Sequence, residues 1–188
     1  MPPQGTEAVR GVRIPLAGGK GTPHRTMDER IVVRFPALAR WLAAAWARLP
    51  RHSRLRRAVL VRRVRRAYEA VNRRDFGLIL TGFDPSVEFN AVQTGPEGPA
   101  TFHGHAGVLE SSRLVLEVFG DIRLEPEEFV DWGDHFLVTV KLTGHGAESG
   151  ASVHQKLFSL CTMRRGLVVR QYEFLDRAEA LEAAGVAE

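Results

Sequence analysis

The amino-acid sequence predicts an α+β protein in which a curved antiparallel sheet wraps around helices. Helical periodicity dominates the first 75 residues, and alternating strands separated by short turns fill most of residues 122–175. One further helix is expected just before this run of strands, after residue 104. Helices followed by a block of hairpin-connected strands are typical of an α+β domain. A chain of 188 residues is long enough for one core of this kind.

The first 52 residues divide into a tail and a helical segment. Residues 1–26 are rich in Gly, Pro and Thr and lack periodicity, so we expect them to be disordered. A regular pattern begins at Met27, which makes this residue a candidate for the true start of the protein. We expect residues 27–52 to form an additional helical segment and residues 53–188 to form the main domain.

Inside the additional segment, a helix is expected from about Phe35 to Leu49. Its large aromatic residues, Trp41 and Trp46, provide apolar area that can cover the domain or a partner subunit. The helix is therefore a candidate lid.

The main domain should open with a long helix that begins at Ser53, a favoured N-cap residue, and runs to about Arg74. One face is apolar and consists of Leu60, Val64, Ala67 and Val71. The opposite face is expected to carry the arginines Arg62, Arg63, Arg65, Arg66 and Arg73. We expect that face to be solvated and partly paired with acids, and contact with nucleic acid or a membrane is a less favoured alternative.

Charge is distributed unevenly along the chain. Residues 1–75 contain 18 Lys and Arg against 5 Asp and Glu, whereas residues 76–188 contain 8 against 17, which leaves a net charge of +4. The acidic second half offers possible partners for the arginine face in a cluster of acids, Glu125, Glu127, Glu128, Asp131 and Asp134. The basic residues are nearly all arginine, a bias that suggests a bacterial genome rich in G and C.

Location and redox state follow from what the sequence contains. The most apolar run, residues 35–50, is broken by two arginines and is too short to span a membrane. No secretory signal is recognisable, so the expected location is the cytoplasm. Cys161 is the single cysteine and cannot form an internal disulfide, so we expect it to be a small core residue.

The last hairpin determines which side chains share a face. If Arg165 and Gly166 are its two turn residues, Leu160 is expected opposite Gln171 and Phe158 opposite Glu173. Both faces mix apolar and polar residues, so alternation alone does not decide which one is inward.

Four stretches resemble a known family. These are "RRAYEAVNRRDFGLILTGFDPSVEFN", "FHGHAGV", "PEEFVDWGDHFLVTVKLTGHGAESG" and "RRGLVVRQYEFLDRAEALEAAG", and they are similar to the SnoaL-like branch of the NTF2-like superfamily. The resemblance covers about residues 58–186. It implies a cone in which a bent antiparallel sheet surrounds a pocket, usually in a homodimer. Members include polyketide cyclases, ketosteroid isomerases, epoxide hydrolases and dehydratases.

Similarity to the ketosteroid isomerases implies that the face with Glu173 lines the pocket. A carboxyl on an apolar concave wall would have a raised pKa and would suit general acid or base chemistry near neutral pH. A carboxyl that lines the pocket without reacting, or that has a structural role, is the alternative. By the same similarity the isomerase catalytic positions fall on Phe89, Leu160 and Ala67, so ketosteroid enolisation is not expected.

Two histidines are further catalytic candidates. His103 and His105 flank a glycine just before a helix and could reach the pocket mouth as acid or base groups, although His105 could simply support the turn. No spacing of His, Cys, Asp and Glu indicates a metal site, and we expect no cofactor.

These expectations converge on a cofactor-free enzyme that transfers protons on a hydrophobic, cyclic small molecule, of the polyketide cyclase, isomerase or dehydratase type. Glu173 would be the acid/base group, assisted by a histidine. The expected substrate-binding residues are Tyr68, Phe89, Phe158, Leu160 and Gln171. The alternative is a non-catalytic ligand-binding or assembly module with the same cone.

Overall fold

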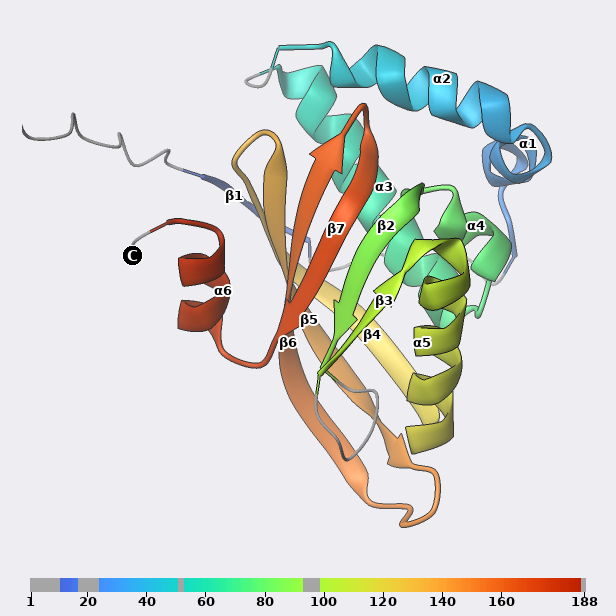
Figure 1. The fold of residues 1–188 in the computed structure, drawn as a ribbon, viewed down its shortest axis with the longest axis vertical. Helices are drawn as coiled ribbons and strands as arrows, with labels where there is room; N and C mark the ends of the chain where they lie inside the picture. The colour runs from blue at the N-terminus through green and yellow to red at the C-terminus, as the bar shows by residue number, and fades with distance from the viewer. Residues whose placement is uncertain (1–10, 17–23, 51–52, 93–98, 187–188) are drawn as a thin grey trace, which may run out of the picture.

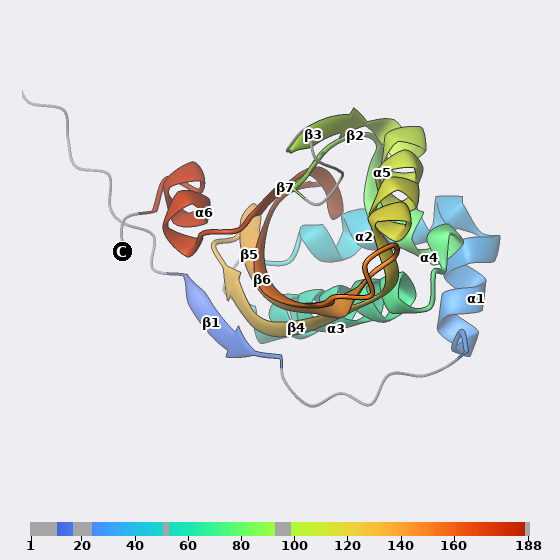
Figure 2. The ribbon, with the colours of Figure 1, turned by 90° about the horizontal axis from the view of Figure 1, so that it is seen from below.

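A computed structural model describes residues 11–16, 24–50, 53–92 and 99–186 of the chain. Seven strands within these ranges form one sheet in the order β1-β4-β5-β6-β7-β2-β3. Their bounds are β1 Val12–Pro15, β2 Phe83–Ala91, β3 Ala100–His103, β4 Phe119–Asp131, β5 His135–Gly146, β6 Ser152–Arg164 and β7 Leu167–Phe174. The strands pair antiparallel except β2 with β7, which run parallel. The fold is α+β, with N-terminal helices and a sheet that curves without closing (Figures 1 and 2).

In the part of the chain that the structure describes, six helices lie against or beside this sheet (Figure 2). They are α1 Met27–Arg34, α2 Pro36–Ala47, α3 Arg54–Asn72, α4 Phe76–Leu80, α5 Gly104–Val118 and α6 Arg177–Ala183. The long helix α3 is capped as expected, because the Ser53 hydroxyl accepts a hydrogen bond from the Arg56 amide at 3.4 Å. Figure 2 shows the sheet as an open arc, with α5 at its open side and α6 outside it. None of the helices in the described ranges is long and apolar enough to cross a bilayer.

Strand alternation divides the apolar side chains between two sides of the sheet. On β5, Phe136, Val138 and Val140 join the cluster that contains Leu60 and Val64 of α3. The intervening Leu137 belongs to a separate cluster against α6. The concave side therefore faces α3, and the convex side is covered in part by α6.

The last hairpin has the expected turn but not the expected register. Arg165 and Gly166 have positive φ angles of 51° and 78°, as a two-residue turn of the I′ type requires. The ladder then shifts, since Met163 pairs with Val168 while Thr162 pairs with Arg170. Val169 is the extra residue of this bulge, and every pair beyond it is displaced by one.

This displacement overturns two predicted pairings. Glu173 lies opposite Ser159, not Phe158, and Gln171 lies opposite Cys161, not Leu160. Phe158 and Leu160 are on the convex side, buried against Leu181 of α6. The prediction that these two residues share a face with Glu173 was wrong, because a bulge cannot be read from a turn alone.

Part of the expected N-terminal tail is ordered. Residues 12–15 form β1, which pairs antiparallel with β4 and places Ile14 opposite Phe129. The following Leu16 is only 2% exposed and belongs to the concave core cluster. Residues 1–10 and 17–23, which share the disorder prediction, lie outside the described residues, as do residues 51–52 of the additional segment.

The arginines of α3 find their partners mainly in α1. Asp28 pairs with Arg66 and, at 3.3 Å, with Arg62, while Glu29 accepts from Arg73 at 3.3 Å. Acids of the second half pair elsewhere, for example Glu128 with Arg177 at 3.0 Å. Within one chain, Arg62 and Arg66 therefore pair with an acid of α1 and not with the β4 acids that the sequence suggested.

Candidate functional site

A cavity of about 220 Å³ lies between α3 and the concave face of the sheet. Apolar side chains dominate its wall, including Leu60, Val64, Val71, Phe89, Val108, Leu124, Val138, Leu142, Leu157 and Val168. Polar side chains on the wall are Arg63, Tyr68, Asn72, Arg74, Ser111, Ser112, Cys161, Gln171 and Glu173. A mostly apolar pocket with a few polar groups is the usual form of a small-molecule site.

Glu173 projects from β7 onto this wall. Burial raises the pKa of its carboxyl from 4.5 to about 7, and hydrogen bonds from the Val92 backbone and the Gln171 side chain hold it from rising further. The acid and the carboxylate forms are therefore both populated near neutral pH, which is the condition for a group that both takes and returns a proton.

Two polar side chains, Tyr68 and Gln171, lie near this carboxyl. Burial raises the pKa of the Tyr68 phenol far above its ordinary value, and the nearby Glu173 adds to the rise, although a hydrogen bond with Ser159 opposes it. Because its pKa is raised, the Tyr68 phenol stays neutral near neutral pH and can donate a hydrogen bond to a ligand oxygen. The other side chain, Gln171, accepts a hydrogen bond at its side-chain oxygen from the Cys161 thiol at 3.6 Å.

Cys161 is held as a thiol. Burial raises its pKa strongly, and the charge of Glu173 contributes in the same direction. A thiol in this state is a weak nucleophile, so covalent catalysis by this cysteine is disfavoured.

Arg63 also lines the cavity, contrary to its expected place on the solvent face of α3. At 100° per residue it lies only about 40° from Ala67, which is on the inner face. Its Nη1 donates to the Gly166 carbonyl at 2.8 Å, and its guanidinium stacks on Trp46 at 5.2 Å. Burial lowers its pKa to about 10, so the side chain stays charged.

The structure brings together four of the sequence-predicted residues. Glu173, Gln171, Tyr68 and Phe89 all line the cavity. The residues that sequence reasoning missed are Arg63, which was assigned to the wrong face, and Cys161, which was treated as plain core. The Ser159 and Cys161 positions would have followed from a correct β6–β7 register.

Four other predicted residues lie away from the cavity wall. Phe158 and Leu160 are convex-side core residues, as described above. His105 makes a contact of 3.1 Å between its Nε2 and the Phe83 carbonyl oxygen, the turn-supporting alternative for this residue. His103 is exposed at the N-cap of α5. Neither histidine is among the lining residues.

The described ranges contain no group of three or more His, Cys, Asp and Glu side chains arranged to hold a metal ion. The wall of the cavity carries acid/base groups and two cationic side chains, Arg63 and Arg74.

Solved structures match about two thirds of this chain. TerC, co-crystallised with polyporic acid, is 28% identical with a TM-score of 0.55, over 65% of this chain and 95% of that one. An NTF2-like protein of unknown function from Burkholderia pseudomallei is 28% identical with a TM-score of 0.56, over 64% and 93%. A putative SnoaL-like polyketide cyclase from Jannaschia, at 18% identity and a TM-score of 0.52 over 68% and 92%, supports the fold alone.

The family assignment rests on a further comparison. No curated protein matches the chain. The family model described as the SnoaL-like domain matches residues 64–171, more than half of the chain and most of the elements that enclose the cavity. With the NTF2-like architecture of its structural neighbours, this match shows that the chain belongs to the SnoaL-like family of the NTF2-like superfamily.

Proposed function

We propose that this protein is a cofactor-free enzyme that transfers protons on a hydrophobic cyclic molecule bound in the α3–sheet cavity. The observation that carries the proposal is the Glu173 carboxyl, whose pKa of about 7 results from burial on a mostly apolar wall. The co-crystallisation of TerC with polyporic acid supports small-molecule binding by a protein of this fold. Cyclisation, isomerisation and dehydration all require such a proton transfer.

The residues divide the work according to their chemistry. Glu173 in its carboxylate form removes a proton from a carbon next to a carbonyl, and the resulting acid returns the proton to another atom of the ligand. Tyr68 donates a hydrogen bond to the oxygen on which negative charge develops. Gln171 fixes the carboxyl through its side-chain hydrogen bond, and the apolar wall keeps water from competing for the proton.

The test measures hydrogen–deuterium exchange next to a carbonyl, a proton transfer that can be followed without knowing the natural substrate. A panel of cyclic ketones is first screened for binding by thermal shift, and the protons next to the carbonyl of a bound ketone are then followed by NMR in D₂O. Wild type should accelerate deuterium exchange, whereas Glu173→Gln should bind with an unchanged Kd and lose the exchange. Glu88→Gln is the matched control, because Glu88 lies on β2 outside the cavity lining and accepts from Tyr172.

The same experiment separates the second candidate function, a non-catalytic binding module. A cavity of about 220 Å³ with a mostly apolar wall suits a ligand in either case. If wild type binds a ketone tightly but exchange is no faster than in buffer, the enzyme proposal fails and the binding module is favoured. Equal exchange by wild type and Glu173→Gln would exclude Glu173 as the acid/base group.

A further inference from the structure

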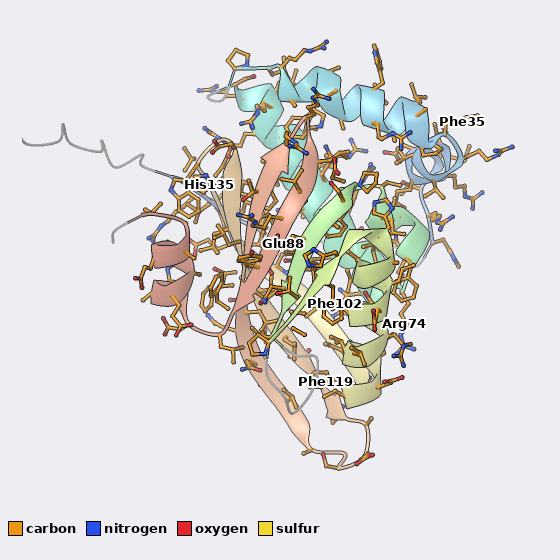
Figure 3. All side chains as sticks on the ribbon, viewed as in Figure 1. Phe35, Arg74, Glu88, Phe102, Phe119 and His135 are labelled. Carbon is orange, nitrogen blue, oxygen red and sulfur yellow. The ribbon has the colours of Figure 1, made fainter. Side chains whose placement is uncertain are left out.

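A stripe of exposed apolar side chains runs along α1 and α2. Of the eleven large apolar side chains that are exposed in the described residues, six come from residues 27–42. They are Met27, Ile31, Phe35, Leu38, Trp41 and Leu42, with exposed fractions from 43% to 71%. Figure 3 shows Phe35 at the outer corner where the two helices meet. We name these six residues the α1–α2 face.

Packing on the protein does not account for this stripe. Helix α2 turns its small side chains inward, with Ala43 buried and its backbone against the Gly166 turn. Trp46 is the large residue that packs inward, against the concave core cluster. Leu38, Trp41 and Leu42 recur at positions i, i+3 and i+4 on the outer side, so the larger apolar surface of the helix is the one that faces away from the core.

The stripe is accompanied by positive charge. Arg30, Arg34, Arg40 and Arg48 are exposed on the same segment, and no described carboxylate lies within ion-pair distance of them. The two acids of the segment, Asp28 and Glu29, are engaged with arginines of α3. Arg34 also lies over the Phe35 ring at 5.6 Å, which places cation and apolar surface next to each other.

We propose that the α1–α2 face docks on the surface of an anionic lipid bilayer. Helices that lie in a membrane interface combine Trp, Phe and Leu on one side with Lys or Arg that contact lipid phosphates. A second copy of the chain would bring the four arginines against their own equivalents, which disfavours that occupant. Nucleic acid would use the arginines but would leave the aliphatic side chains without a partner.

The position of the face in the chain supports a role separate from the cavity. The family match begins at residue 64, inside α3, so α1 and α2 lie outside it. Docking through this surface would bring the enclosed cavity close to a store of apolar molecules without using any residue of its wall.

The test is co-sedimentation of the full chain with vesicles. Wild type should bind vesicles of equal parts phosphatidylcholine and phosphatidylglycerol, bind neutral phosphatidylcholine vesicles far less, and dissociate as salt is raised. Phe35→Ser with Trp41→Ser should weaken binding at least about tenfold, and Arg34→Gln with Arg40→Gln should do the same. Leu109→Ser is the control, since Leu109 is 39% exposed on α5.

Binding of a second copy of the chain or of nucleic acid to the α1–α2 face would each give a different experimental result. Absence of binding to anionic vesicles, or equal binding by the Phe35/Trp41 variant, overturns the proposal. If light scattering also shows a dimer that this variant dissociates, the face is an interface between copies. If an oligonucleotide binds and only the arginine variant loses it, while vesicles do not bind, the face is a nucleic-acid surface.

Discussion

Wild type should lose stability as the pH rises because the pKa of Glu173 is raised, and replacing Glu173 with glutamine should remove this loss. The folded carboxyl has a pKa of about 7 against 4.5 for an ordinary glutamic acid, so the folded state holds the proton more tightly. The contribution of this carboxyl to the free energy of unfolding is fully present below pH 4.5 and is lost as the pH rises through 7. Glutamine carries no titrating proton and cannot show this loss.

The magnitude follows from the two pKa values. Between about pH 5.5 and about pH 8.5, wild type should lose about 2 kcal/mol of unfolding free energy through this one group. The remaining titrating groups are shared by both proteins and largely cancel in the difference. The free energy of unfolding of Glu173→Gln, minus that of wild type, should therefore increase by about 2 kcal/mol over this range.

Urea denaturation at closely spaced pH values measures this difference directly. Glu110→Gln is the control, because Glu110 is exposed on α5, and this variant should follow wild type throughout. A difference between Glu173→Gln and wild type that stays constant with pH would refute the burial argument, and with it the acid/base role built upon it.

Three further predictions concern the surroundings of the cavity. Gly166→Ala should destabilise the protein by about 2 kcal/mol or more in urea titrations, because φ is +78° and the new Cβ would lie 2.2 Å from the Ala43 carbonyl oxygen; an unchanged midpoint would contradict that contact. Leu16→Ala should cost about 2–4 kcal/mol while Val12→Ala costs under about 1, and equal effects would mean that β1 does not anchor the core. Cys161 should react with a thiol reagent at pH 8 at least about tenfold faster in denaturant than in the folded protein, and fast native labelling would argue against its raised pKa.

Local patterns in the sequence were sufficient for the elements and for part of the site. Ser53 capped the long helix as expected, and the Arg165–Gly166 pair formed the turn between the last two strands. The inward direction of Glu173 followed from strand alternation together with the family resemblance. These features depend on residues close in the chain, where side-chain chemistry and backbone preference act directly.

The remaining features depend on contacts between distant segments. The bulge at Val169 moved Phe158 and Leu160 out of the predicted site, although the turn itself was correct. Arg63 is a cavity residue because Trp46 of α2 and the Gly166 carbonyl hold its guanidinium there. Trp46 precedes Arg63 by more than fifteen residues in the sequence, and Gly166 follows it by more than a hundred.

The same distinction governs the chemistry. The sequence by itself determined that a carboxyl, a phenol and an amide would stand on neighbouring elements of a cone. Only the tertiary structure decided that Glu173 is desolvated and that the large apolar residues of α2 face outward. Burial is a property of everything that surrounds a group, so neither the pKa of a carboxyl nor the exposure of a helix face can be obtained from spacing alone.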